Sequence, residues 1–135
     1  MTLLHNHLLG ALCAADPSGW LPGLEPVALA PGQVLFEAGH TPSAVVFTTS
    51  AVVSLSPMTR EGATAEFAVV GDEGVVGISL FMGGDATSHR ALVQSAGHGW
   101  RLDAALAKRA AQRAGQALQL LLGYAQSLIV QTVQT

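Results

Sequence analysis

The residues best suited to chemistry lie between positions 69 and 93, where three glycines precede a lone arginine. The glycines are Gly71, Gly74 and Gly77, and the arginine is Arg90. The backbone N–H groups of a glycine-rich turn can hold a phosphate or another anion together with a guanidinium. A purely structural interpretation is also open, in which at least two of the three glycines adopt positive φ angles at turns.

The role of Arg90 is open in the same way. As a binding group it would hold an anion, and as a structural group it would pair with Asp85 or another nearby carboxylate. The glycine spacing matches neither a Walker A loop, which needs Gly-Lys-Ser/Thr, nor a dinucleotide-binding fingerprint, which needs a strand and a helix around it. The sequence therefore does not predict nucleotide hydrolysis or dehydrogenase activity.

No catalytic arrangement is recognisable in the rest of the sequence. The segment "GISLF" is not the Gly-x-Ser-x-Gly motif of a nucleophilic serine. Cys13 is the only cysteine, so one chain has no internal disulfide and no cysteine-held metal or iron–sulfur cluster. The β-rich part has no His-x-His pair of the kind that binds metal in cupins. We therefore predict no catalytic residues and no metal site.

The composition is that of a globular chain with few charges. The 135 residues are 50% hydrophobic and 11% charged, with a net charge of -3. Such a length fits one domain with a real core, and the scarcity of charge suggests a surface partly covered by a partner. The six Lys and Arg are scattered, which argues against nucleic-acid binding by this chain alone. Since no apolar run approaches the roughly 20 residues that span a bilayer, we expect a soluble, cytoplasmic protein.

Hydrophobic periodicity divides the chain into a helix, a β-rich middle and a helical end. The first helix is predicted from Thr2 to Ala15 and ends before "DPSGWLPG", where Pro and Gly break regular structure. Short valine-rich runs then alternate with turns such as "APGQ" and "EAGH". They predict about eight antiparallel strands in a small sandwich or roll, with "VVGISLF" among them. In one of these strands, Phe67 and Val69 should face away from Glu66 and Ala68.

Two helices are predicted after Leu102. Asp103 would cap "DAALAKRAAQRAG", which breaks near Gly115. The last segment has apolar residues near heptad spacing. They are Leu118, Leu121, Ala125, Leu128 and Thr132, with Leu122, Ile129 and Val133 widening the stripe. This stripe is wider than one small roll needs, and the segment reaches Thr135 without a capping residue, so we expect a dimerisation helix that is cut in the middle.

The order of these elements resembles the sensor half of the Crp/Fnr superfamily of bacterial transcription regulators. The segments "LAPGQVLFEAGH", "VVFTTSAVVSL", "VVGDEGVVGISLFMGG", "HRALVQSAG" and "RLDAALAKRA" carry the resemblance, which covers essentially the whole chain. It implies a cyclic-nucleotide-binding-like antiparallel β-roll (a double-stranded jelly roll) at residues 1–113 and the start of a dimerisation helix at 114–135. In that superfamily DNA is bound by a helix-turn-helix that follows the helix, and we expect this chain to lack it.

The resemblance also implies a ligand site. Gly77 matches the family's glycine, and Arg90 with Ala91 matches the family's arginine and the small residue after it. Ile78 stands where the family has a glutamate for the ribose hydroxyl, and such a charge-assisted hydrogen bond is worth roughly 1.5–3 kcal/mol. Thr132 falls near the place where the family's long helix contacts the base. A cyclic nucleotide is therefore a candidate ligand, but a different ligand, or none, is favoured.

Together these observations predict the effector-sensing and dimerisation domain of a Crp/Fnr-like regulator. Two chains would form a homodimer along the last helix, and a shift of that helix would carry the signal. The expected interface is Leu118, Leu121, Leu122, Ala125, Leu128, Ile129 and Thr132. The alternatives are a domain that has lost its ligand and only oligomerises, a cupin-type metalloenzyme, and a gas sensor whose haem is held by His89 or His98.

Overall fold

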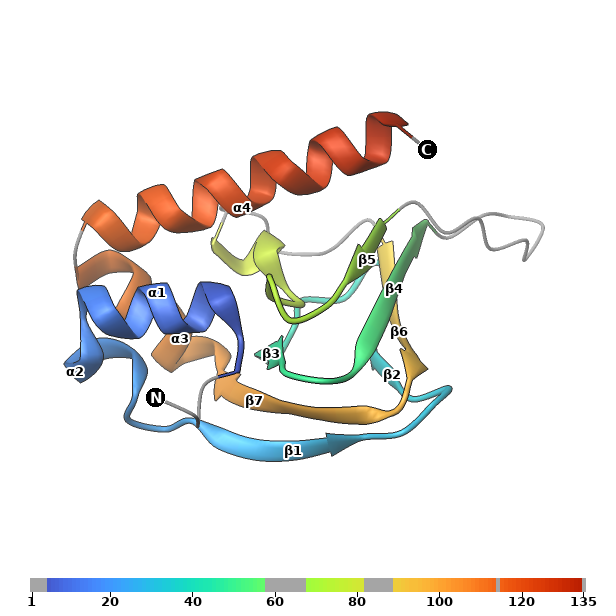
Figure 1. Cartoon of the computed structure of the whole chain (residues 1–135), viewed down its shortest axis with the longest axis horizontal. Helices are drawn as coiled ribbons and strands as arrows, with labels where there is room; N and C mark the ends of the chain where they lie inside the picture. Colours follow the sequence, from blue (N-terminus) through green and yellow to red (C-terminus); the bar gives the residue numbers. More distant parts are fainter. Residues whose placement is uncertain (1–4, 58–67, 82–88, 114, 135) are drawn as a thin grey trace.

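Two antiparallel sheets form a roll, and the helices gather at one end of it and along one side (Figure 1). The computed structural model describes residues 5–57, 68–81, 89–113 and 115–134. In chain order the elements are α1 (His7–Ala15), α2 (Pro17–Trp20), β1 (Glu25–Leu29), β2 (Val34–Phe36), β3 (Ala44–Thr48), β4 (Val52–Pro57), β5 (Ala68–Val70), the 3-10 helix η2 (Ile78–Phe81), β6 (His89–Ser95), β7 (Gly97–Asp103), α3 (Ala104–Arg113) and α4 (Gly115–Gln134).

The sheets confirm the predicted fold class, a mainly β roll with flanking helices. Sheet A has the strand order β1-β7-β3, and sheet B has the order β2-β6-β4-β5. Seven strands lie within the described residues, and "VVGISLF" is not one of them. Val76 makes only an isolated bridge with Val46, and η2 follows at once. The reason is Gly77, whose φ of 104° turns the chain out of an extended path.

Strand β3 of sheet A is packed on both faces, which gives the molecule two hydrophobic clusters. Val45 and Phe47 of β3 face the helices, whereas Val46 between them faces sheet B. We call the first the helix-side cluster; its buried members are Leu8, Leu9, Leu12, Cys13, Trp20, Val45, Phe47, Val75, Leu80, Leu102, Ala107, Ala110, Ala117, Leu121 and Tyr124. We call the second the inter-sheet cluster; it contains Leu29, Phe36, Val46, Ala51, Val53, Leu55, Ala68, Val70, Val76, Ala91 and Val93.

Ala68 and Val69 face opposite sides of β5, as the alternation predicted, whereas Glu66 and Phe67 lie outside the described residues. Ala68 and Val70 are buried, whereas Val69 is only half-buried. The register with β4 explains this, because Leu55 pairs with Ala68 and Val53 pairs with Val70, so these four side chains share the inner face. The sequence predicted the alternation but not which face points inward, because a shift of one residue in register exchanges the two faces of a strand.

The first helix is shorter than predicted, beginning at His7 instead of Thr2. Asn6 is its N-cap: the residue is extended, and its Oδ1 accepts a hydrogen bond from Leu9 N at 2.8 Å. The predicted break after Ala15 contains the short helix α2, since a proline is tolerated in a first turn. This helix places Trp20 fully inside the helix-side cluster.

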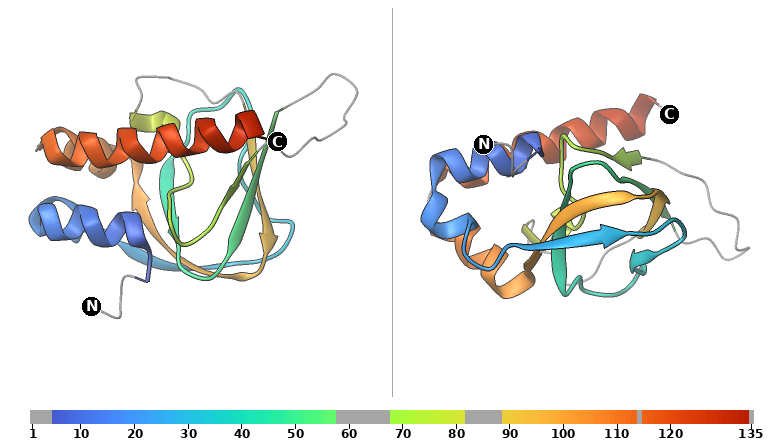
Figure 2. Two further views of the ribbon diagram at one scale, coloured as in Figure 1. Left: turned by 45° about the horizontal axis from the view of Figure 1, so that its top comes forward. Right: turned by 60° about the horizontal axis from the view of Figure 1, so that its bottom comes forward.

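The last two helices follow the predicted boundaries. Asp103 Oδ2 accepts a hydrogen bond from Ala105 N at 3.1 Å at the start of α3, which confirms the predicted cap. An ion pair between Arg113 Nε and Asp16 Oδ2, at 2.8 Å, ties the end of α3 to the start of α2. Helix α4 then runs beside α1 and on across the roll, in contact with η2 and β5 (Figure 2). Within the described residues, no helix combines the length and apolarity that crossing a membrane requires.

Candidate ligand-binding site

The glycines of residues 71–81, which we call the cassette segment, serve different purposes. Gly77 is the only one of Gly71, Gly74 and Gly77 with a positive φ, so the expectation of at least two was wrong. A Cβ at Gly74 would overlap the ring of Tyr124 on α4. Gly74 is therefore required by the close approach of a helix, and its N–H donates to Gly71 O at 3.3 Å to close the turn.

Arg90 has an internal carboxylate as its partner, and this is Glu37. Its Nε lies 3.3 Å from Glu37 Oε1, and both side chains are part-exposed. The sequence had suggested Asp85, which lies outside the described residues. The Nε is buried and lacks the alignment of a hydrogen bond. Arg90, the second residue of β6, thus faces Glu37, which directly follows β2, and a part-exposed ion pair of this kind contributes little stability.

Ile78 and Ala91, both expected at the ligand, belong to different clusters. Ile78 is half-buried and packs on the helix-side cluster from η2. Ala91 is fully buried in the inter-sheet cluster and lies opposite Phe36 of β2 and Leu55 of β4. The side chain that replaces the family's glutamate is thus engaged with the helices. Gly77 and Arg90 are therefore the expected ligand residues that still fit anion binding, through a backbone N–H group and a guanidinium.

Helix α4 reaches the roll through a polar residue that the sequence did not single out. Gln131 Oε1 accepts a hydrogen bond from Val69 N at 2.8 Å, which satisfies the edge strand β5. Leu128 packs against both hydrophobic clusters. Thr132, the expected base contact, has a side chain outside the described residues, as has Ile129. The sequence feature that could have identified Gln131 is its position one helical turn beyond Leu128, on the inner face of α4.

Tyr124 links α4 directly to the cassette segment. Its side chain is buried, and burial raises the pKa of its phenol, with the nearby Glu73 carboxylate acting in the same direction. The hydroxyl stays protonated at neutral pH and has no well-aligned hydrogen-bond partner among the described residues. The backbone of Val75 lies close enough to the hydroxyl to act in the opposite direction on its pKa, so Tyr124 meets the cassette segment at both Gly74 and Val75.

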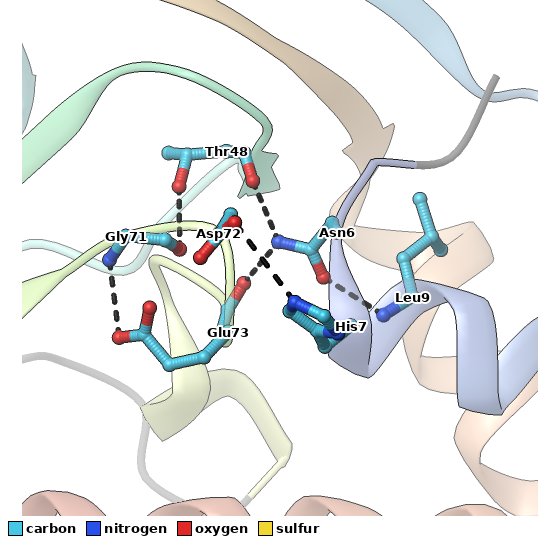
Figure 3. A network of polar contacts seen from close by, with 8 residues as sticks. Asn6, His7, Leu9, Thr48, Gly71, Asp72 and Glu73 are labelled. Atoms are coloured by element: carbon cyan, nitrogen blue, oxygen red, sulfur yellow. Dashed lines mark hydrogen bonds and ion pairs between the residues drawn. The ribbon is translucent and has the colours of Figure 1, made fainter. Parts of the chain in front are cut away.

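A buried asparagine joins α1 to the same turn (Figure 3). Asn6 Nδ2 donates to Thr48 O at 2.7 Å and to Gly74 O at 2.8 Å. Thr48 Oγ1 donates to Gly71 O at 2.6 Å, and His7 N donates to the carbonyl of Asp72 at 2.8 Å. The turn at 71–74 is therefore held by α1 and β3 through hydrogen bonds and by α4 through Tyr124. Sequence reasoning missed Asn6; its one signal was an N-cap residue ahead of an apolar run.

The residues expected at a dimer interface occupy two faces of α4. Leu121 is fully buried in the helix-side cluster, and Leu128 is half-buried against both clusters. Leu118 and Leu122 point outward, with exposed fractions of 43% and 48%. Ala125 is half-buried. One broad apolar stripe is thus shared between the chain's own core and its surface.

The groups that could support other chemistries are scattered. Within residues 5–57, 68–81, 89–113 and 115–134, no three His, Cys, Asp or Glu residues gather in a way that could hold a metal ion. Cys13 is buried among the helices, and burial raises the pKa of its thiol. His89 lies beside Phe36, with ring centroids 5.7 Å apart, whereas His98 is exposed on β7.

Comparison with known proteins identifies the fold. No protein-family model matches the sequence, and no curated protein is significantly similar to it in sequence. Among solved structures, the sensor domain of the transcriptional regulator DNR from Pseudomonas aeruginosa is similar, with a TM-score of 0.72 and 20% identity over 98% of this chain and 89% of that one. The chain has the cyclic-nucleotide-binding-like β-roll fold of Crp/Fnr sensor domains.

Two further structures show how widely this fold is used. The N-terminal domain of a transcriptional regulator from Streptomyces coelicolor A3(2) is 22% identical, with a TM-score of 0.65, and the alignment covers 96% of this chain and 94% of that one. The regulatory subunit of a cAMP-independent protein kinase A from Trypanosoma brucei is 15% identical, with a TM-score of 0.75. That alignment covers 93% of this chain but 45% of the kinase subunit.

Proposed function

We propose that this chain is the effector-sensing and dimerisation domain of a Crp/Fnr-like transcription regulator, and a binding module, not an enzyme. The fold of regulator sensor domains supports this proposal. In the proposed mechanism, an occupant of the roll changes how α4 packs on the cassette segment. Two packings of α4 exchange, and the effector shifts their populations.

The two faces of α4 carry the proposal. Its inner face holds Leu121 and Tyr124 against the helix-side cluster and the turn at 71–74. Its outer face presents Leu118 and Leu122, which are one helical turn apart and exposed. The occupant we assign to this outer face is α4 of a second copy, because a helix with apolar residues at heptad-like spacing buries them by self-pairing. Any movement of the inner face would then be transmitted to the partner chain.

Sedimentation velocity tests the dimer with a Leu118→Lys/Leu122→Lys double variant. The wild-type chain should sediment as a dimer, and the double variant as a monomer with an unchanged melting temperature, because both lysines can remain in water. Leu106→Lys is the matched control, since Leu106 is an exposed leucine of α3, outside the proposed interface. A monomeric wild-type chain, or a double variant that is still dimeric, would overturn the proposal.

A second candidate is a roll that has lost its nucleotide and acts only in oligomerisation. Glu37 against Arg90 favours it, because the arginine that would hold a phosphate already has an anionic partner. The packing of Ile78 on the helix-side cluster points the same way. A cAMP-independent kinase subunit with a similar fold provides a parallel. Both candidates need the dimer; they differ in whether α4 responds to a bound molecule.

A further inference from the structure

A cavity of about 330 Å³ that is open to solvent on one side is lined by residues of β1, β2 and β3, together with Val76 and Arg101; Ala28, Gln33 and Ser43 on its rim are exposed. Its apolar walls come from the inter-sheet cluster and include Leu29, Phe36, Val46 and Val76. Its polar groups are Gln33, Ser43 and Arg101. Val76 of the cassette segment lines it, whereas Gly77, Ile78 and Arg90, the residues expected at a ligand, do not.

The cavity has one positively charged group, the guanidinium of Arg101. In sheet A, Arg101 stands between Val46 of β3 and Glu25 of β1, on the face that looks toward sheet B. Its nearest carboxylate is loosely held: Arg101 Nη1 lies 3.8 Å from Glu25 Oε1, and the Glu25 side chain is 66% exposed. So distant and exposed a pair contributes little, and a carboxylate inside the cavity can replace it with two parallel hydrogen bonds.

Two neutral polar residues also line the cavity: Gln33 follows the end of β1, whereas Arg101 pairs with Glu25 at its start, and Ser43 directly precedes β3. Gln33 is fixed in the β1–β2 turn, where its Oε1 accepts from Ala30 N at 3.0 Å, and its amide NH2 remains a donor. Ser43 adds a hydroxyl that can donate or accept. The opposite walls offer only hydrocarbon.

The size of the cavity limits the ligand. A volume of 330 Å³ equals roughly eleven times the share of one water molecule in the liquid, which corresponds to a ligand of about ten non-hydrogen atoms. Small-molecule sites of this kind are mostly apolar and have a few placed polar groups. We propose that the cavity binds a small amphipathic carboxylate, such as a medium-length acyl chain, with its carboxylate on Arg101 and its hydrocarbon between Leu29, Phe36 and Val46.

This site does not depend on the proposed dimer, but it includes one residue of the cassette segment. Val76 lines the cavity and immediately precedes Gly77 and η2. It is fixed to β3 by two backbone hydrogen bonds with Val46, at 2.8 and 3.1 Å. A ligand that displaces this pair would therefore act on the middle of the cassette segment. The cavity thus gives the roll a second place at which a small molecule can act.

Isothermal titration of the whole chain with octanoate tests the proposal, with octanamide as the neutral ligand of equal length. Octanoate should bind at least ten-fold more tightly than octanamide, and Arg101→Gln should abolish that preference. Arg109→Gln, at an exposed arginine of α3 that does not line the cavity, is the matched control and should leave octanoate binding unchanged. Val27→Phe, which places a larger side chain on the cavity wall, should block binding without lowering the melting temperature.

Several results would overturn the assignment. They are no heat with octanoate, equal binding of octanoate and octanamide, or loss of octanoate binding in Arg90→Gln, which would move the site to the cassette. A parallel titration with cAMP keeps the two sites apart, since heat from cAMP should depend on Arg90 and not on Arg101. Sedimentation velocity measures the dimer independently of these titrations. Failure of the carboxylate site and failure of the dimer are therefore distinguishable.

Discussion

The two hydrophobic clusters share β3 but are built differently. The helix-side cluster contains the large aromatic groups: Trp20 meets Phe47 edge-on, with centroids 6.2 Å apart, and lies 6.1 Å from Phe81 of η2. The inter-sheet cluster is mostly aliphatic, and it adjoins the 330 Å³ cavity and the guanidinium of Arg101. One cluster fastens the helices to the cassette segment, and the other leaves room for a ligand.

This difference assigns separate tasks to the two sides of sheet A. Tight aromatic packing transmits displacement, because closely packed groups cannot move independently. A cavity with a charged group at one end allows a ligand to bind without rebuilding the core. Leu128 of α4 packs on both clusters and so lies where the two tasks meet. The following variants separate these tasks, beginning with the largest expected effect.

Phe47→Ala and Val46→Ala remove neighbouring side chains from opposite faces of β3. Phe47→Ala should lower the free energy of unfolding by about 3–5 kcal/mol, because it opens a hole beneath Trp20. Val46→Ala should cost only about 1–2 kcal/mol, since it removes fewer methyl groups beside an existing cavity. Urea denaturation measures both. A red shift of Trp20 fluorescence should accompany only the first, and equal losses in the two variants would refute the contrast.

Gly74→Ala tests the contact between α4 and the cassette segment. The added methyl overlaps the Tyr124 ring, so the free energy of unfolding should fall by about 1–3 kcal/mol. Gly123→Ala, in α4 itself, is the control: nothing lies within 4 Å of its added Cβ, and alanine should stabilise the helix by up to about 1 kcal/mol.

Truncation of the ring identifies the cause of the Gly74→Ala loss. Thermal or urea unfolding of Gly74→Ala/Tyr124→Leu should show a smaller loss than the sum of the two single variants, because the overlap is then relieved. Strictly additive losses would mean that Gly74 does not contact Tyr124. This comparison of single and double variants thus distinguishes two reasons for a glycine at position 74: contact with the Tyr124 ring, or the backbone conformation of the turn.

Short-range sequence patterns predicted the parts of the fold that depend on residues close together in the chain. The alternation of valines predicted a roll, Asp103 predicted the start of α3, and the break before Gly115 separated α3 from α4. Each of these depends on residues a few positions apart. The predicted length of the first helix was wrong because Asn6 caps its N-terminus. The helix therefore begins at His7, although the apolar pattern extends further toward the start of the chain.

The parts that were missed depend on which segments meet in space. Glu37 reaches Arg90 only because β2 pairs with β6. Ile78 packs toward the helices because Gly77 turns the chain there. The heptad pattern of α4 could not say whether a leucine faces its own core or the surface, since Leu121 and Leu122 both satisfy it. These distinctions arise from tertiary contacts, which periodicity does not contain.

The smallest predicted effect concerns pH and the inter-sheet side, where His89 lies against Phe36. Burial lowers the pKa of His89 in the folded chain. Below about pH 6.5 the unfolded chain therefore binds more protons than the folded one, so stability falls as pH decreases through that value and is unaffected above it. Urea denaturation at pH 7 and pH 5 should show a smaller decrease for His89→Gln than for wild type. The exposed His98→Gln should retain the wild-type decrease, and a similar reduction in both variants would show that burial beside Phe36 is not the cause.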